Sequence, residues 1–319
     1  MSNPHPFRFG VINEQVFPAE TWLAHVRRIE AYGYATFLIR DHFVPDYFGD
    51  QLGPIAALMA AASATTSLRI GSLVLDNDYR HPAVLAKEAA TLDLLSGGRF
   101  ELGLGAGWLQ AEYQQAGLPF DPAGVRISRL EEAIQVLKGL FAGTPLTFSG
   151  QHYTITGLNG FPKPAQRPHP PLLIGGGKKR ILTLAGREAN IVGILTTSVA
   201  SGSLSDDPTE RLAPAVAEKI GWVRQGAGDR FYELELSLVP TILMTEQRQQ
   251  QAEQLIRERG WAGITVEQVL EMPSVFIGPP DQIVEDMLSR RERYGFSYYI
   301  ISDHDMDDFA PIVARLAGK

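Results

Sequence analysis

Asp41 and His42 are adjacent residues with the chemistry of proton transfer, and they directly follow the apolar run Ala35 to Ile39 and Arg40. An imidazole titrates near neutral pH, and a neighbouring carboxylate can orient or charge it. Such a pair can donate or accept a proton at a reacting group. The alternative interpretation is a polar cap at the end of a strand.

Three glycines, Gly175, Gly176 and Gly177, precede Lys178 and two further cations at the predicted start of a helix. Free backbone N–H groups at a helix N-terminus bind anions, and the helix dipole favours negative charge there. The segment therefore predicts a phosphate-binding loop, with a solvated charge cluster as the alternative. It is not a P-loop, because no Ser or Thr follows the first lysine.

The hydroxyl-rich segment Thr196-Thr197-Ser198 follows the next predicted strand. Its hydroxyls can bind a phosphate or a ring carbonyl, or belong to an ordinary loop. The run from Gly103 to Trp108 places a third cluster of glycines after a strand. Its spacing differs from the dinucleotide fingerprint. Glycines such as Gly105 would let a planar ring approach the backbone, although a tight turn is the more common use.

Composition excludes several other functions. The 319 residues include no cysteine, so disulfides, thiolate nucleophiles and cysteine-ligated metals are excluded, and the seven histidines show no His-Glu-x-x-His pattern. We therefore predict no metal. The net charge of −7 argues against a nucleic-acid partner. No basic, apolar leader and no long apolar span is visible, so we expect a soluble, cytoplasmic protein that does not enter a membrane.

The elements that must position these residues alternate between short apolar runs and amphipathic helical patterns. The predicted strands cover 7–12, 35–39, 68–75, 100–104, 172–174, 191–195, 234–244 and 298–301, with a short extra strand at 275–278. About eight strand–helix units favour a parallel α/β (β/α)8 barrel, the TIM barrel, over an open sheet. Function in such a barrel lies at the C-terminal ends of the strands, where the residues above are found.

One segment breaks the alternation, and we interpret residues 143–171 as an insertion within a single domain covering 1–319. It contains a predicted hairpin with strands at 146–148 and 153–155 and a turn at Ser149-Gly150, followed by a proline-rich stretch.

Three runs together resemble the bacterial luciferase-like monooxygenase superfamily: Arg69 to Leu75, Tyr79 to Lys87, and Thr91 to Trp108. Within that superfamily, the chain is most similar to oxidoreductases that depend on the deazaflavin coenzyme F420, and the resemblance covers nearly the whole sequence. It implies the same barrel and a cofactor held at its rim.

The resemblance also implies roles for single residues. Leu73–Val74 matches a non-proline cis peptide that backs the cofactor ring. Asp41 and His42 match the pair near that ring, with His42 the candidate proton donor or acceptor. The Gly175–Gly177 loop with Lys178 matches the phosphate site, and Thr196 matches a nearby polar contact.

Two positions depart from the sugar-phosphate dehydrogenases of the family. Trp108 stands where those enzymes have a glutamate, and Val199 stands where they have a lysine. A sugar-phosphate substrate is therefore disfavoured, and Trp108 is expected to form an apolar or aromatic wall of the substrate pocket.

The function predicted on these grounds is an F420-dependent oxidoreductase that transfers hydride between the deazaflavin ring and a small organic substrate. One alternative is an FMN-dependent monooxygenase that uses reduced flavin and oxygen. A second is a non-catalytic protein that binds flavin or deazaflavin. A homodimer is expected by analogy with the family.

Overall fold

A computed structural model describes residues 5–45, 47–197, 199 and 202–319. Its main sheet is parallel throughout, with strands in the order β3-β2-β1-β13-β10-β9-β8-β5-β4, and β3 also pairs with β5 to close it. Because β3 and β4 share one position beside β5, the closed barrel has eight strand positions, which confirms the predicted (β/α)8 fold. The strands are β1 Arg8–Ile12, β2 Thr36–Ile39, β3 Arg69–Ser72, β4 Leu75–Asp76, β5 Phe100–Gly105, β8 Leu172–Gly176, β9 Ile191–Ile194, β10 Glu235–Leu238 and β13 Phe296–Ser302.

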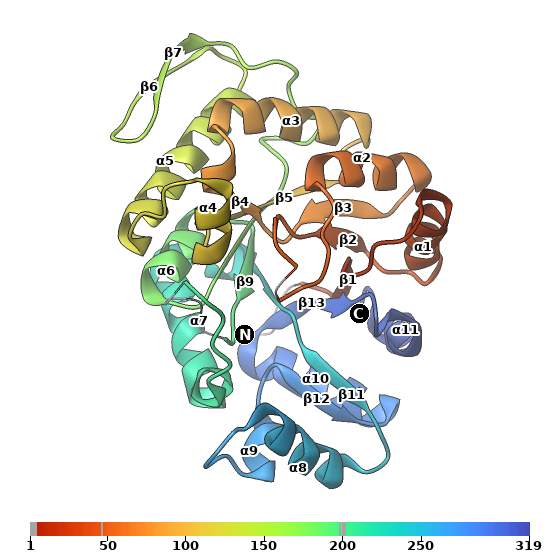
Figure 1. The fold of residues 1–319 in the computed structure, drawn as a ribbon. Helices are drawn as coiled ribbons and strands as arrows, with labels where there is room; N and C mark the ends of the chain where they lie inside the picture. The colour runs from red at the N-terminus through yellow and green to blue at the C-terminus, as the bar shows by residue number, and fades with distance from the viewer. Residues whose placement is uncertain (1–4, 46, 198, 200–201) are drawn as a thin grey trace.

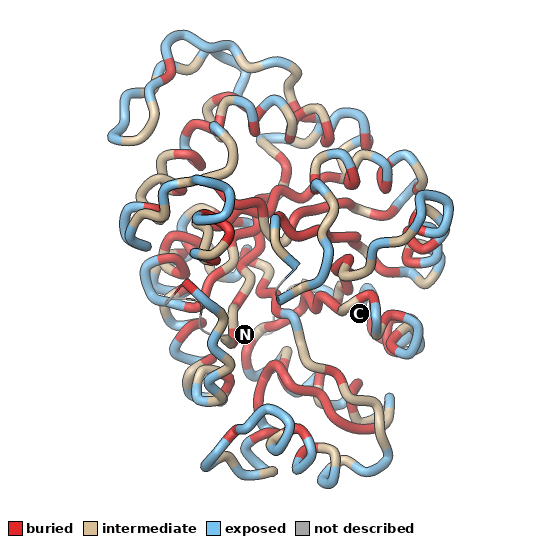
Figure 2. Tube along the Cα trace, viewed as in Figure 1, coloured by how far each residue is buried: buried red, intermediate tan, exposed pale blue. Residues whose placement is uncertain are grey.

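Helices surround the barrel and bury one face each against it (Figure 1). In α1, for example, Trp22, Val26 and Ile29 recur at helical spacing and are all buried. The strands and the inner helix faces form the buried centre, while the outer faces are exposed (Figure 2). The surrounding helices are α1 Ala19–Ala31, α2 Pro54–Ala64, α3 Pro82–Leu95, α5 Ala123–Phe141, α6 Lys179–Glu188, α7 Ala213–Ala227, α10 Pro280–Tyr294 and α11 Met306–Leu316.

The predicted strand at 68–75 is two strands in the structure. β3 ends at Ser72, β4 begins at Leu75, and the Leu73–Val74 peptide bond between them is cis, as the family resemblance predicted. Both strands pair with β5, so the interruption makes a bulge in the barrel wall without opening it.

The prediction of a single strand at 234–244 is wrong. It divides into β10, which belongs to the barrel, and β11 (Thr241–Met244), which pairs in parallel with β12 (Val275–Gly278). Pro240 lies at the break and cannot donate a hydrogen bond to a strand ladder. The second sheet packs with α8 (Arg248–Arg259) and α9 (Val266–Glu271) around its own apolar cluster, in the lower part of Figure 1. The sequence did not predict α9.

The predicted hairpin is confirmed as β6 (Leu146–Ser149) and β7 (Thr154–Leu158), an antiparallel pair that projects beyond α5 and α3 in Figure 1. Glu132 of α5 holds its turn, because its carboxylate accepts hydrogen bonds from the backbone N–H groups of Gln151, His152 and Tyr153. None of the helices within the described ranges is long and apolar enough to cross a membrane.

The N-terminal ends of the barrel strands carry a network of charged side chains, which we call the floor network. It consists of Arg8 of β1, Arg69 of β3, Glu101 of β5 and Glu235 of β10. Arg8 contacts both carboxylates, and Arg69 Nε donates to Glu101 Oε1 at 2.6 Å. Burial opposes ionisation of Glu101, yet the two guanidinium groups hold its pKa below the usual range. The floor network therefore links the strands at the end of the barrel opposite the predicted site.

Candidate active site

His42 lies just beyond the C-terminal end of β2, at the rim where the site was predicted. Its Nδ1 is 2.9 Å from Oε2 of Glu112, and its side chain is 12% exposed. Glu112 is on α4 (Gln110–Ala116), a short helix that sequence reasoning missed. The two elements meet because α4 follows β5 at the same rim as the loop after β2.

Glu112 is almost fully buried and has four polar partners from two segments, the loop after β2 and Tyr79. Besides His42, it accepts hydrogen bonds from the backbone N–H groups of Phe43 at 2.7 Å and Val44 at 3.1 Å, and from the Tyr79 hydroxyl at 3.1 Å. Burial opposes its ionisation, but the hydrogen bond and charge of His42 and the two N–H groups hold the pKa of Glu112 below its usual range. Glu112 is therefore a carboxylate at neutral pH.

Aromatic rings line the exposed side of His42. The ring centroid of Phe48 is 5.0 Å from that of His42, and Trp108 approaches His42 edge-to-face at 5.8 Å. Tyr47 lies 5.6 Å from Trp108. The guanidinium of Arg40 stacks on Phe48 at 4.2 Å. The structure thus places Trp108 beside His42, within an aromatic cage formed by Tyr47, Phe48 and Trp108.

Asp41 points into the wall and away from the open rim. Its carboxylate pairs with Arg80 and accepts a hydrogen bond from the backbone N–H of Asp76 at 3.1 Å. The side chain is only 4% exposed. Contact between Asp41 and a cofactor stays a prediction, whereas its present contacts tie the end of β2 to the end of β4.

Asp76 ends β4 and is a second buried acid that sequence reasoning missed. Tyr113 donates its hydroxyl proton to Asp76 Oδ2 at 2.8 Å, and the backbone N–H of Asp78 donates to Oδ1 at 2.8 Å. Burial raises the pKa of Asp76 from 3.8 to about 7, with the nearby charges of Asp78 and Asp41 adding to the effect. A side chain at Gly107, where φ is +68°, would collide with both Tyr113 and Asp76.

The glycines of β5 fit closely against the bulge between β3 and β4. A Cβ atom at Gly105 would lie 2.7 Å from a methyl group of Val74, and one at Gly103 would lie 1.9 Å from the carbonyl oxygen of Ser72. Leu73 and Val74 pack against apolar residues of the barrel interior. The predicted ring-backing residues Leu73, Val74 and Gly105 are therefore neighbours, and their contact with a cofactor ring stays a prediction.

The predicted Gly175–Gly177 loop lies between Ile174 and α6, but Gly175 and Gly176 are the last residues of β8, so that only Gly177 and Lys178 join β8 to α6. Among the residues that the structure describes, no side chain caps the N-terminus of α6, and its first turn carries no acidic residue. The backbone N–H groups of that turn are thus left for an anion. Packing also explains two of the glycines, because a Cβ at Gly176 would lie 2.4 Å from Ile181 and one at Gly177 would lie 3.2 Å from the Leu195 carbonyl oxygen.

Lys178, which precedes α6, forms an ion pair with Glu210. Its Nζ lies 2.5 Å from Glu210, whose other carboxylate oxygen is 2.8 Å from Nζ of the buried Lys219. Lys219 also donates to the Leu195 carbonyl oxygen at 2.8 Å, which fixes the chain just before Thr196. Thr196 itself is buried and accepts from Arg211 at 3.3 Å. Ser198 lies outside the described residues.

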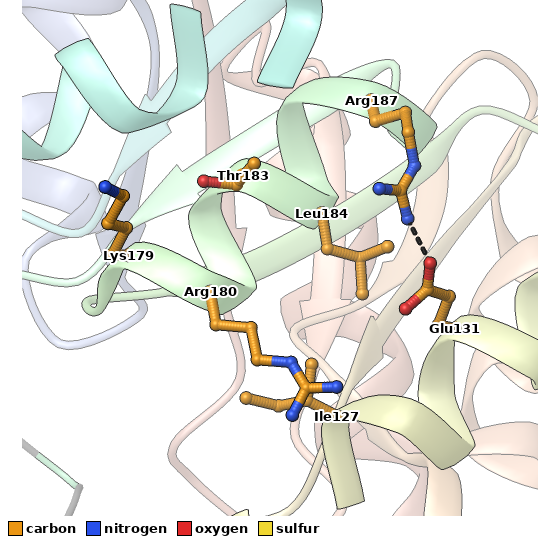
Figure 3. Close-up of a pocket in the computed structure, with 7 residues that line it drawn as sticks. All are labelled: Ile127, Glu131, Lys179, Arg180, Thr183, Leu184 and Arg187. Atoms are coloured by element: carbon orange, nitrogen blue, oxygen red, sulfur yellow. Dashed lines mark hydrogen bonds and ion pairs between the residues drawn. The ribbon is translucent and has the colours of Figure 1, made fainter. Parts of the chain in front are cut away.

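A groove of about 390 Å³ runs between α5 and α6 on the outside of the barrel. Figure 3 shows Arg187 paired with Glu131 at one end, Arg180 lying over Ile127, and Lys179 turned away from this pair. His42, Trp108 and Val74 do not line this groove. It is a surface groove beside the start of α6, apart from the predicted site residues His42, Trp108 and Val74.

Glu14, Asp303 and His304 bring possible metal-ligand atoms within 4.8 Å of one another at the rim. Arg40 already binds one oxygen of Glu14 at 2.6 Å, and Ser302 binds the other at 2.5 Å. We assign these side chains to the scaffold of the strand ends.

Sequence reasoning located His42 and Trp108 but missed Glu112, Tyr79 and Asp76. Glu112 is separated from His42 by 70 positions, so no local pattern links them. One signal was present. Glu112 and Tyr113 sit four and five residues beyond Trp108, one helical turn past the glycine run.

Comparison with known proteins places this geometry in a family. Residues 5–203 match the model of the luciferase-like monooxygenase family. An F420-dependent glucose-6-phosphate dehydrogenase of Microbacterium testaceum is 28% identical over 95% of this chain and 94% of its own. An FMNH(2)-dependent dimethylsulfone monooxygenase of Pseudomonas putida is 29% identical, over 59% of this chain and 55% of its own.

Solved structures support the fold. An F420-dependent secondary alcohol dehydrogenase superposes with a TM-score of 0.74 at 17% identity, covering 98% of both chains. A long-chain alkane monooxygenase superposes with a TM-score of 0.76 at 13% identity, covering 98% of this chain and 91% of its own. The barrel, the matched family model and these relatives agree, and the chain therefore belongs to the luciferase-like monooxygenase family as an oxidoreductase of that class.

Proposed function

We propose that the protein is an F420-dependent oxidoreductase that transfers hydride between the deazaflavin and a small, largely apolar alcohol, carbonyl or unsaturated compound. The observation that carries this proposal is His42, which stands at the rim inside an aromatic cage with Nδ1 bound to a buried carboxylate. The F420-dependent relative that matches nearly the full chain supports this cofactor over FMN.

The rim offers groups suited to both ends of such a cofactor. The uncapped start of α6 and the Gly175–Gly177 loop suit a phosphate, and the close fit of Gly105 on Val74 leaves a smooth apolar wall beside the strand ends. Both F420 and FMN carry a phosphate, so the anion loop does not choose between them.

The redox step belongs to the cofactor, which supplies two-electron hydride chemistry when bound. The protein handles the proton. In alcohol oxidation, Nε2 of His42 accepts the hydroxyl proton as the carbon loses hydride, and in carbonyl reduction it returns a proton to the oxygen. The aromatic cage around His42 binds the apolar part of the substrate and excludes water.

The cage also argues against a sugar phosphate. Trp108 and Phe48 offer aromatic faces beside His42, and the guanidinium of Arg40, which stacks on Phe48, is already paired with Glu14. A phosphorylated sugar needs cations and hydrogen-bond donors at this position. We therefore infer that the substrate differs from that named for the dehydrogenase of Microbacterium testaceum.

A fluorescence titration of the purified protein with oxidised F420 and with FMN tests the cofactor. We expect F420 to bind with a Kd below roughly 100 μM, about 5.5 kcal/mol, and FMN to bind more weakly. Tighter binding of FMN, with oxygen consumption when reduced FMN is supplied, would favour the monooxygenase alternative. Binding of neither would refute the proposal.

A substrate panel tests the reaction. Small secondary alcohols, their ketones, an α,β-unsaturated carbonyl compound and glucose-6-phosphate would be compared by following the F420 absorbance. Turnover of an apolar compound without turnover of the sugar phosphate is expected, and the reverse result would contradict the inferred substrate class.

A further inference from the structure

We propose that Glu112 is a positioning residue that, whenever the His42 ring is neutral, holds it as the Nδ1–H tautomer and so leaves the Nε2 lone pair available at the rim as the proton acceptor. The kinetic consequence rests on the proposed function. The tautomer does not, because it can be measured in the protein without cofactor or substrate.

The two carboxylate oxygens of Glu112 face different partners. Oε1 faces the backbone N–H groups of Phe43 and Val44, and Oε2 faces His42 Nδ1 and the Tyr79 hydroxyl. A backbone N–H can only donate, so Oε1 can only accept. The side chain of Glu112 is 1% exposed, which leaves water no access to replace any of these partners.

The charge state of Glu112 then determines the proton on His42. Its hydrogen bonds keep the pKa of Glu112 below the usual range despite burial, so the group is ionised at neutral pH. An ionised carboxylate accepts hydrogen bonds and donates none. Nδ1 of His42 must therefore carry the hydrogen, and in the neutral ring Nε2 is unprotonated.

The neighbouring rings keep His42 in this orientation. Phe48 packs against one face with its centroid at 5.0 Å, and Trp108 meets the ring edge-to-face at 5.8 Å. Among the described residues, none forms a hydrogen bond to Nε2 in the structure. That nitrogen is accessible to solvent and is therefore available to a substrate at the rim.

Glu112 would also stabilise the charged ring that forms when Nε2 takes up a proton. A buried carboxylate bonded to one ring nitrogen favours the imidazolium and keeps the ring in place, without itself taking the proton. Glu112 thus acts through His42 and is not a catalytic residue.

The substitution Glu112→Gln gives a sharp test because the neighbours decide which way the amide turns. Its oxygen must face the N–H groups of Phe43 and Val44, so its NH₂ group replaces Oε2. The NH₂ group then donates to Nδ1 of His42, and Tyr79 can accept from it. Every partner is satisfied, but the neutral ring must change to the Nε2–H tautomer.

Long-range ¹H–¹⁵N correlation spectra of the protein labelled at histidine would report both tautomers, with the His42 signals assigned from a His42→Gln sample. We expect Nδ1–H in the wild type and Nε2–H in Glu112→Gln. Tyr79→Phe is the matched control, because it removes another donor to the same oxygen and should leave the tautomer unchanged.

Kinetics complete the test. Turnover of Glu112→Gln should fall by about 100-fold or more, the usual contribution of a general base, while the Kd for F420 changes little. A wild-type protein with the Nε2–H tautomer would overturn the proposal even if the variant does not fold. An unchanged tautomer, or unchanged turnover with a reversed tautomer, would overturn it as well. Failure of the wild type to bind F420 would instead refute the proposed function.

Discussion

At the scale of single residues, the proposed site depends on His42, whose Nδ1 is bound to the buried carboxylate of Glu112. The clearest test of its role is His42→Ala. Turnover should fall by about 100-fold or more, because no other described imidazole or amine takes its place beside Trp108, while the Kd for F420 should stay within about threefold. Stopped-flow turnover and fluorescence titration measure the two quantities.

Loss of cofactor affinity in His42→Ala, in parallel with the loss of turnover, would show that the residue binds and does not transfer a proton. Normal turnover would remove it from the reaction altogether. Phe43→Ala is the neighbouring variant for comparison, because it keeps the backbone N–H that donates to Glu112 and removes a side chain that is 59% exposed and stacks on Tyr79 at 4.5 Å.

Asp76 gives a prediction about pH. Its pKa of about 7 in the folded protein exceeds its ordinary value of 3.8, so between these values the folded protein holds a proton that the unfolded chain releases. The stability from this proton is complete below about pH 4 and is lost as the pH rises through about 7. Asp76→Asn stays neutral throughout.

The difference in unfolding free energy between Asp76→Asn and the wild type should therefore shift in favour of the variant as the pH rises from 5 to 8. The shift should be up to about 1.4 kcal/mol per pH unit. Urea denaturation at pH 5, 6, 7 and 8 measures the difference. Parallel pH curves for the two proteins would show that Asp76 titrates near its ordinary pKa.

At the scale of elements, β5 and the bulge between β3 and β4 must fit each other. Gly105→Ala would place its Cβ 2.7 Å from Val74 and should destabilise the protein by about 1–3 kcal/mol through overpacking. Val74→Ala removes the methyl group that the new Cβ at position 105 would contact. A double-mutant cycle by urea denaturation should show favourable coupling of about 1–2 kcal/mol.

Gly103→Ala provides the control for this cycle. Its Cβ would meet the backbone oxygen of Ser72 at 1.9 Å and a methyl group of Val74 at 3.1 Å, and truncating Val74 would relieve only the second, weaker clash. Coupling of equal size for Gly103 and Gly105 would mean that the bulge relaxes as a whole and that Val74 is not the specific neighbour.

The same elements show what the sequence could predict. Barrel strands and covering helices have apolar periodicities that repeat within a few residues, so their order and most of their limits follow from the sequence. The positions of His42 and Trp108 follow once the strand ends are known. The cis bond at Leu73–Val74 came only from the family resemblance.

Long-range contacts explain what sequence reasoning missed. Glu112 is on a helix of seven residues, too short for a periodic pattern, and its partners come from the loop after β2 and from Tyr79. The break between β10 and β11 had a visible signal in Pro240, but the apolar run from Leu234 to Met244 masked it. The shifted pKa of Asp76 requires burial that composition does not reveal.

At the scale of the whole molecule, the two ends of the barrel carry different sets of side chains. The floor network joins the N-terminal strand ends, and the proposed site lies at the C-terminal ends. Glu101→Gln should cost about 3–5 kcal/mol of unfolding free energy, because it removes a buried carboxylate and leaves Arg8 and Arg69 poorly paired. Turnover of the protein that remains folded should not change.

Glu235→Gln is the matched variant in the floor network. Glu235 pairs with Arg8 but not Arg69, and its side chain is more exposed than that of Glu101. In a thermal or urea melt, Glu235→Gln should lose less unfolding free energy than Glu101→Gln. A fall in turnover of folded Glu101→Gln protein would show instead that the floor network shapes the rim.

The edge-to-face contact between Trp108 and His42 also supplies a built-in optical reporter. Of the four tryptophans, Trp22 and Trp261 are buried in packed clusters and Trp222 lies on α7, so Trp108 is the indole beside His42. A change in the charge of the imidazole or the arrival of an absorbing ring at the rim should quench its emission. Subtracting the spectrum of Trp108→Phe would isolate that signal and allow occupancy to be followed without a label.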